Sequence, residues 1–128
     1  MDTQSNQAGS LIAVVDDEES VCRALERLLR SAGFDVETFT SGAAFLTSGG
    51  RWRAACVVLD LHMPGFTGWD VQLGLAEASQ DVPVVVITGR DSDEARERAI
   101  ANGAVAYLRK PIDDKTLLET LATAMARS

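Results

Sequence analysis

Three acidic residues at the ends of apolar segments are the first candidates for chemistry in this chain. Asp16 and Asp17 directly follow the apolar run Leu11–Val15, and Asp60 directly follows the apolar run Ala54–Leu59. Carboxylates gathered in one place repel one another, so a shared proton or a bound cation must offset their charge. Oxygen ligands without a cluster of Cys or His favour Mg²⁺ over zinc. The three aspartates therefore predict a magnesium site, provided that the fold brings them together.

A hydroxyl and an ammonium group occupy equivalent positions. Thr88 follows the apolar run Val82–Ile87, and Lys110 follows Ala104–Leu108 by two residues. Lys110 can contact a phosphate as a point charge, and Thr88 can donate a hydrogen bond to it. A carboxylate beside a metal can also act as a nucleophile towards phosphorus, which gives an aspartyl phosphate. Together these groups predict phosphoryl transfer to an aspartate by positioning and electrostatics. The sequence has neither GxxxxGK[ST] nor GxGxxG, so nucleotide binding is unsupported.

An alternation of strands and helices would position these residues. Four nearly continuous apolar runs are typical of strands buried on both faces of a parallel sheet, and a fifth, alternating segment suits a sheet edge. The expected strands are Leu11–Val15, Phe34–Phe39 (the edge), Ala54–Leu59, Val82–Ile87 and Ala104–Leu108. The expected helices are Val21–Ala32, Ser41–Thr47, Gly68–Ala78, Ser92–Asn102 and Asp113–Ala126. This order predicts a doubly wound α/β domain, in which ligands bind at the carboxyl ends of the strands.

Composition limits the kind of protein this can be. The 128 residues, 46% apolar and 24% charged, suit a single globular domain. There are 12 Lys plus Arg against 19 Asp plus Glu, a net charge of −7, which argues against nucleic-acid binding by this chain. The one basic-aromatic patch, Arg51-Trp52-Arg53, is interpreted as a loop with an anchoring Trp. Cys22 and Cys56 each fall in an apolar segment and are expected to be reduced core residues.

The predicted location in the cell rests on the leader and on the longest apolar runs. No apolar run approaches the ~20 residues of a membrane span. The leader MDTQSNQAGS (1–10) has neither a basic nor an apolar region of a signal peptide, and it is expected to be a disordered polar tail. We therefore expect a tail over 1–10, one domain over 11–127 and, by default, a cytoplasmic location without membrane contact.

Four stretches resemble one known family. The segments "VVDDEE" (14–19), "LDLHMPGFTGWD" (59–70), "VVVITG" (84–89) and "GAVAYLRKP" (103–111) match bacterial response-regulator receiver domains, the CheY-like superfamily, in order and spacing. The segments "SGAAFL" (41–46) and "GWDVQLGL" (68–75) are most similar to receivers of the nitrogen-fixation regulator (FixJ) type. The resemblance covers essentially all of 11–127. It implies a flavodoxin-like parallel sheet of five strands in order 2-1-3-4-5 with five helices.

The resemblance also implies a role for each matching acidic residue. Asp60 would be the phosphoacceptor. Asp16 and Asp17 would bind Mg²⁺ together with the Asp60 carboxylate and the backbone carbonyl of His62. The resemblance implies that the side chain two residues after Asp60, that of His62, tunes dephosphorylation, but it gives no direction for a histidine. As a metal ligand or phosphorylation site the ring has no partner His or Cys, and it is interpreted as a solvated loop histidine. The remaining acids at this strand end, Glu18 and Glu19, are interpreted as helix N-terminal acids that favour the helix dipole.

Three further positions acquire implied roles. Thr88 would be the hydroxyl that moves onto the phosphoryl group. Tyr107 would occupy the aromatic switch position, where it would act either as a moving switch or as a static strand aromatic. Lys110 would contact the phosphoryl oxygens and precede a cis bond to Pro111. The charge run Asp91–Arg98 is interpreted as a solvated helix face beside the family's output surface.

The implied function is a signalling switch rather than an enzyme with a separate substrate. A sensor histidine kinase or a phosphotransfer protein would donate the phosphoryl group. Phosphorylation would change an output surface formed by Ser92–Asn102, Ala104–Leu108 and Asp113–Ala126. That surface would contact an output partner, an attached and possibly DNA-binding domain, or a second copy of the chain.

Two other functions stay open from the residues alone. A metal-dependent phosphatase with an aspartyl-phosphate intermediate would use a similar sheet, but its second acidic residue would stand where His62 does. A flavodoxin-like electron carrier would need a hydroxyl-rich phosphate loop after the first strand, where this chain has four acids.

Overall fold

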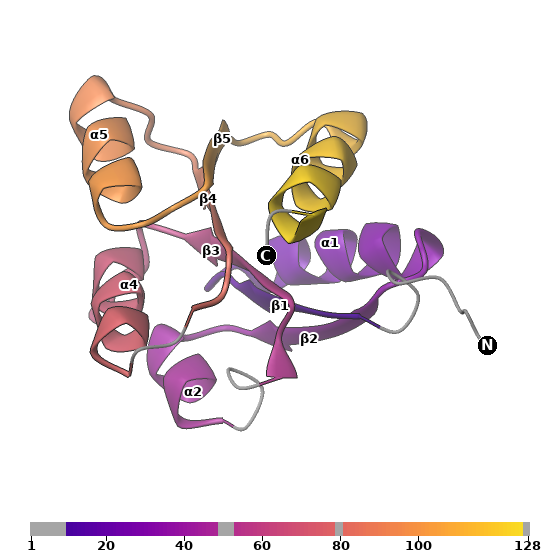
Figure 1. Cartoon of the computed structure of the whole chain (residues 1–128), viewed down its shortest axis with the longest axis horizontal. Helices are drawn as coiled ribbons and strands as arrows, with labels where there is room; N and C mark the ends of the chain where they lie inside the picture. Colours follow the sequence, from indigo (N-terminus) through magenta and orange to yellow (C-terminus); the bar gives the residue numbers. More distant parts are fainter. Residues whose placement is uncertain (1–9, 49–52, 79–80, 127–128) are drawn as a thin grey trace.

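A five-stranded parallel sheet forms the centre of the computed structural model, which describes residues 10–48, 53–78 and 81–126. The strands are β1 (Leu11–Val15), β2 (Asp35–Phe39), β3 (Cys56–Asp60), β4 (Val84–Thr88) and β5 (Ala106–Arg109). The helices of the described residues are α1 (Glu19–Ser31), α2 (Gly42–Thr47), α4 (Gly68–Glu77), α5 (Asp93–Ala101) and α6 (Asp114–Ala126). The strand order is β2-β1-β3-β4-β5 with every pair parallel, which confirms the predicted fold (Figure 1). The leader (1–9), Arg51 and Trp52 lie outside the described residues.

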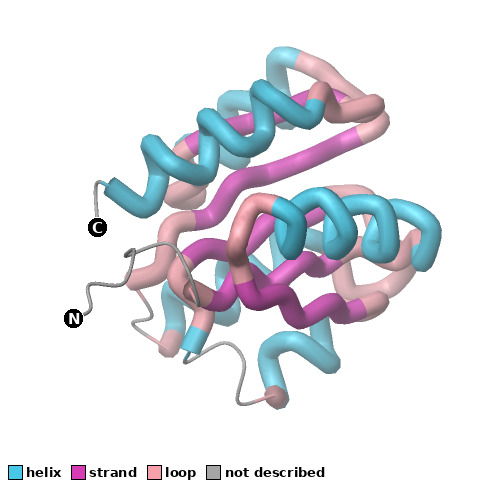
Figure 2. The backbone as a smooth tube through the Cα atoms, turned by 90° about the vertical axis from the view of Figure 1, so that its right-hand side faces the viewer, coloured by secondary structure: helices cyan, strands magenta, loops and turns pink. Residues whose placement is uncertain are grey.

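Helices cover both faces of the sheet. Helices α1 and α6 lie on one face, and α2, α4 and α5 lie on the other (Figures 1 and 2). Successive strand residues point to opposite faces of the sheet, so each central strand contributes side chains to two hydrophobic cores. In β1, Ile12 and Val14 pack with residues of α1 and α6, whereas Ala13 and Val15 pack with residues of α2 and α4. This two-sided burial explains why the central strands read as continuous apolar runs.

Three strands begin two residues later and end one residue later than the apolar runs indicate. The expected segments Ala54–Leu59, Val82–Ile87 and Ala104–Leu108 correspond to β3, β4 and β5. The apolar runs extend beyond the hydrogen-bonded strand residues. Ala104 is buried but precedes β5, and Pro83, which precedes β4, has no N–H to donate to a neighbouring strand. Asp60, Thr88 and Arg109 are therefore the last residues of their strands instead of the first residues after them.

Side chains at the helix ends fix where several helices begin. The Ser41 and Ser92 hydroxyls each accept a backbone hydrogen bond at 3.0 Å, so α2 and α5 begin one residue after these caps. Helix α4 begins with a capping box formed by Thr67 and Asp70. Gly33, with φ of +98°, follows Ala32, the C-cap of α1.

Two further sequence predictions concern the cysteines and membrane-spanning segments. Cys22 and Cys56 are free and buried, as expected. Burial raises the pKa of the Cys22 thiol to about 11 and that of Cys56 to about 12, so both are protonated at neutral pH. None of the helices in the described ranges is both long and apolar enough to cross a membrane.

Candidate functional site

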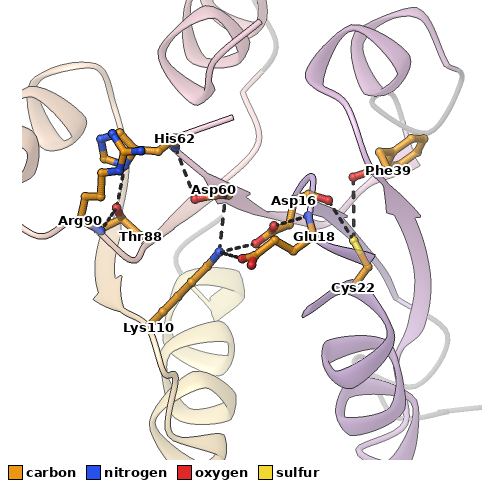
Figure 3. Close-up of polar contacts among 9 residues, drawn as sticks. All are labelled: Asp16, Glu18, Cys22, Phe39, Asp60, His62, Thr88, Arg90 and Lys110. Carbon is orange, nitrogen blue, oxygen red and sulfur yellow. Dashed lines mark hydrogen bonds and ion pairs between the residues drawn. The ribbon is translucent and has the colours of Figure 1, made fainter. Parts of the chain in front are cut away.

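Asp60 lies at the carboxyl end of the central strand β3, between two groups of polar residues (Figure 3). Its side chain is almost completely buried. Burial, together with the charge of Asp16, raises the Asp60 pKa to about 6, although the Lys110 ammonium partly offsets the shift. We call Asp16, Glu18 and Lys110 the ionic flank. We call His62, Thr88 and the backbone N–H of Arg90 the hydroxyl flank.

Lys110 connects the acids of the ionic flank. Its Nζ lies 2.8 Å from Asp16 Oδ2, 3.0 Å from Glu18 Oε1 and 3.7 Å from Asp60 Oδ2. Burial alone lowers the pKa of this ammonium, but the bonds to Asp16 and Glu18 outweigh burial and raise it above its ordinary value. Lys110 is therefore charged at neutral pH and is the cation that the carboxylates share.

Asp16 is fixed by its backbone and by one carboxylate oxygen. Its N–H donates to Phe39 O at 3.0 Å, and the Cys22 thiol donates to its carbonyl at 3.2 Å. Oδ1 accepts a hydrogen bond from the Glu18 N–H at 2.9 Å. Oδ2 is buried, has no hydrogen bond within the described part of the chain, and depends on the ion pair with Lys110. Asp16 therefore has a buried carboxylate oxygen that can accept a further hydrogen bond or bind a cation, and it lies close to Asp60.

The acids fit a hard divalent cation. Asp16, Asp17 and Asp60 each offer a carboxylate oxygen, and these atoms all lie within 4.8 Å of one another. Mg²⁺ binds through one or two carboxylates and keeps several waters, so three such oxygens close together suit it. Nothing in the structure tests whether the backbone carbonyl of His62 joins them, and that ligand stays a prediction.

Thr88 is the centre of the hydroxyl flank. It is fully buried at the end of β4, and its Oγ1 accepts a hydrogen bond from the Arg90 N–H at 3.0 Å. His62 Nδ1 lies 2.9 Å from the same oxygen (Figure 3). Burial and the charges of Arg90 and Lys110 lower the His62 pKa, so the imidazole is neutral at pH 7. The interpretation of His62 as a solvated loop residue was wrong, because its ring is partly buried against Thr88.

Two glycines explain how the loop after Asp60 carries His62 to this position. Gly65 has a φ of +73°, in the left-handed region that favours glycine. A Cβ on Gly68 would lie 2.5 Å from the carbonyl oxygen of Asp60, so only glycine allows α4 to begin this close to β3. The Gly68 N–H donates to Leu61 O at 2.9 Å. The loop between β3 and α4 is therefore held tightly across the end of β3.

Tyr107 is buried and covered by a side chain from α5. Its ring is 7% exposed, and the Arg96 guanidinium lies 4.7 Å from the ring centroid. Arg98 stacks in the same way on Trp69, 4.2 Å from that centroid. Asp91 pairs with Arg109 at 3.7 Å. The charged residues of 91–98 are exposed, as interpreted, and Asp91, Arg96 and Arg98 also contact side chains outside this run.

Comparison with known proteins identifies the family. Residues 12–122 match the family model of the response regulator receiver domain. The chain belongs to this family. Receiver homologues include the response regulator protein TmoT of Ectopseudomonas mendocina, 38% identical over 94% of this chain and 54% of TmoT. Solved structures include a response regulator receiver protein from Burkholderia phymatum (44% identity, TM-score 0.80, 91% of this chain and 95% of that one) and FixJ-N (30%, 0.86, 95% and 98%).

The family match establishes the general function of this domain but not the output of the whole protein. This receiver domain is a signalling domain of two-component systems. The chain spans about half the length of the curated relatives that it matches. The output activity of the whole protein is therefore a matter for proposal.

The structure brings most of the predicted receiver residues together. Asp16, Asp17, Asp60, Thr88 and Lys110 gather at the carboxyl ends of the strands, whereas Tyr107 lies within β5, against Arg96 of α5. The Lys110–Pro111 bond is cis, as the resemblance implies.

Two residues of the receiver crevice were missed from the sequence. Glu19 is a first-turn acid, as predicted. Glu18 makes no side-chain cap and instead binds Lys110, which is 92 residues away in the chain. Arg90 acts through its backbone N–H. No local pattern reveals either contact.

Proposed function

We propose that this receiver domain is a phosphorylatable switch that accepts a phosphoryl group on Asp60. The observation that carries the proposal is the convergence of three carboxylate oxygens within 4.8 Å, with Lys110 and Thr88 close to Asp60. Asp16, Asp17 and Asp60 would hold Mg²⁺, with the backbone carbonyl of His62 as a possible fourth protein ligand. When bound, Mg²⁺ would neutralise charge on the transferring phosphoryl oxygens.

The chain's own groups divide the work of the transfer. A carboxylate oxygen of Asp60 attacks phosphorus in a phosphohistidine donor, the P–N bond breaks, and the leaving imidazole nitrogen keeps the electron pair and is protonated. Lys110 moves from carboxylates to phosphoryl oxygens, which carry more charge. Thr88 donates a hydrogen bond to another phosphoryl oxygen. Tyr107 would respond at the aromatic switch position beneath Arg96.

We also propose a phosphoryl donor and an output surface for this domain. A sensor histidine kinase or a phosphotransfer protein would supply the phosphoryl group. The output surface would comprise α5, β5 and α6, and it would contact an output partner, an attached domain or a second copy. Because relatives such as TmoT are about twice as long, an attached domain, of the DNA-binding kind that the resemblance implies, is the favoured output. The domain would act in the cytoplasm, where such kinases present their phosphohistidine.

The phosphatase and electron-carrier alternatives have no support here. The family match points to signalling. The position where a phosphatase would place its second acid holds His62, whose ring bonds Thr88.

Direct phosphorylation tests the proposal. Incubation with Mg²⁺ and acetyl phosphate should add the mass of one phosphoryl group to the intact chain, and EDTA should prevent the gain. Asp60→Asn should abolish the gain. Asp114→Asn, an exposed acid at the start of α6, is the matched control and should behave as wild type. A wild-type chain that gains no mass with acetyl phosphate or any other small phosphodonor would refute the proposed function.

A further inference from the structure

The Thr88 hydroxyl has one proton and two possible acceptor lone pairs. One lone pair accepts the hydrogen bond from the Arg90 N–H at 3.0 Å. The second partner is His62 Nδ1 at 2.9 Å, where the direction of the hydrogen bond depends on the histidine tautomer. These two bonds account for every side-chain partner of Thr88 among the described residues.

Burial decides the direction of the second bond. Thr88 is completely buried, so its proton cannot be satisfied by bulk water. If His62 donated from Nδ1, the Thr88 proton would have no acceptor within the described part of the chain. If Thr88 donates to Nδ1, both the hydroxyl proton and the ring nitrogen are satisfied. Buried polar groups are almost always paired, which favours the second arrangement.

We propose that Thr88 donates its only proton to His62 Nδ1 in the unphosphorylated receiver, and that His62 is thereby a positioning residue that holds the hydroxyl away from Asp60. This inference rests on the proposed function. A phosphoryl group on Asp60 needs the same proton from Thr88, so it must compete with the imidazole. No covalent bond changes in this exchange, since one hydrogen-bond acceptor replaces another. His62 therefore determines how readily Thr88 responds to phosphorylation.

The loop geometry supports this role. Gly65 and Gly68 hold the segment after Asp60 close to the end of β3, and His62 lies in that segment. Figure 3 shows the His62 ring next to Thr88, and Lys110 and Asp16 on the other side of Asp60. The hydroxyl has one proton, so Thr88 gives up its bond to His62 when it donates to a phosphoryl group on Asp60.

The first experiment observes the hydrogen bond itself. His62 is the only histidine in the chain, so its ring nitrogens give unambiguous ¹⁵N NMR signals. At pH 7.5 we expect an unprotonated Nδ1, a protonated Nε2, and a change in the Nδ1 shift in Thr88→Val. Beryllofluoride with Mg²⁺, a phosphoryl mimic, should move the Nδ1 signal in the direction of the Thr88→Val position. A protonated Nδ1, or a ring that does not respond to Thr88→Val, would overturn the inference.

The second experiment measures the consequence. His62→Phe keeps a ring but removes the acceptor, and it should bind beryllofluoride with Mg²⁺ about twofold to tenfold more tightly, as expected for release of one neutral hydrogen bond. His62→Asn can place its Oδ1 at the position of Nδ1 and should bind as wild type does. Arg90→Ala removes a nearby charge but leaves the backbone donor, and it should weaken binding of the anion.

The outcomes separate the inference from the proposed function. If His62→Phe binds beryllofluoride no more tightly than wild type, or no more tightly than His62→Asn, the inference fails while the proposed function stands. If the wild-type chain neither binds beryllofluoride nor gains a phosphoryl group from acetyl phosphate, the proposed function fails and the role of His62 in switching fails with it.

Discussion

The ionic flank and the hydroxyl flank of Asp60 are held together by different kinds of interaction. On the ionic flank, one ammonium group lies within 3.0 Å of two carboxylates and 3.7 Å from a third. On the hydroxyl flank, a buried hydroxyl forms two hydrogen bonds with neutral groups. The ionic flank has more negative charge than Lys110 can neutralise, and the hydroxyl flank is balanced. The first is therefore suited to receive a cation, and the second to exchange one hydrogen bond for another.

This difference predicts how each flank responds to pH, metal, salt and substitution. Unneutralised charge in a buried place costs free energy that a cation or a proton can recover. A neutral hydrogen bond contributes only about 1 kcal/mol net, and salt hardly changes it.

The largest effect concerns the charge of Asp60 itself. Its pKa rises from 3.8 in the unfolded chain to about 6 in the fold. Between these values the native state binds more protons than the unfolded state, so its stability falls as pH rises and then levels off above about pH 6. In EDTA at pH 7.5, Asp60→Asn should therefore be more stable than wild type, by up to about 3 kcal/mol.

Urea unfolding of both proteins across the pH range tests this prediction. The advantage of Asp60→Asn should shrink as the pH falls from 6 to 4, where the wild-type carboxyl becomes protonated. Asp114→Asn should show no such pH-dependent advantage. Equal stabilities of Asp60→Asn and wild type at pH 7.5 would mean that Lys110 fully compensates the charge.

The next effect concerns Asp16 and the metal. Asp16→Asn removes one of the three clustered carboxylates and should weaken Mg²⁺ binding at least tenfold, or about 1.4 kcal/mol. Saturating Mg²⁺ should raise the melting temperature of wild type, because a ligand that binds only the native state stabilises it. That rise should largely disappear in Asp16→Asn and persist in Asp35→Asn, an exposed control on β2. An unchanged Mg²⁺ response in Asp16→Asn would place the metal elsewhere.

How much of this site could be predicted from the sequence depends on the range of each contact. Asp16 and Thr88 could be located because parallel strands bring their carboxyl ends to one edge, so that an apolar run ending in a polar residue marks the crevice. Lys110 could be located in the same way, and the resemblance added the assignment of Tyr107. Strand boundaries could not be placed to the residue, because apolar packing continues past the hydrogen-bonded ladder at Ala104.

Contacts between side chains from distant segments could not be predicted. Glu18 stands at a helix N-terminus, where the helix dipole is a sufficient reason for an acid, so its position does not indicate a second partner. His62 stands in a Gly- and Pro-containing loop, where histidines are commonly solvated. Its contact with Thr88 depends on how tightly Gly68 packs against β3, which is a property of the folded backbone.

A smaller effect is expected on the hydroxyl flank. Thr88→Val keeps the shape of the side chain but removes its bonds to His62 and to the Arg90 N–H, and it should cost about 1 kcal/mol. Because both partners are neutral, the loss should be the same in 0.1 M and 1 M NaCl, as measured by urea unfolding. Thr38→Val, the same exchange at an exposed position of β2, should cost nothing. A strongly salt-dependent loss in Thr88→Val would show that the hydroxyl flank also depends on charge.

The smallest effect is expected at the outer edge of the ionic flank. Glu18 is 59% exposed, so water and salt screen its ion pair with Lys110. Glu18→Gln should therefore change the free energy of unfolding by less than about 1 kcal/mol, and 1 M NaCl should erase the difference. Glu19→Gln is the matched control, since Glu19 pairs with the exposed Arg23 at 3.6 Å and does not touch Lys110. If Glu18→Gln instead cost as much as the removal of a buried charge partner, Lys110 would depend on Glu18 for its position, and the ionic flank would extend to the protein surface.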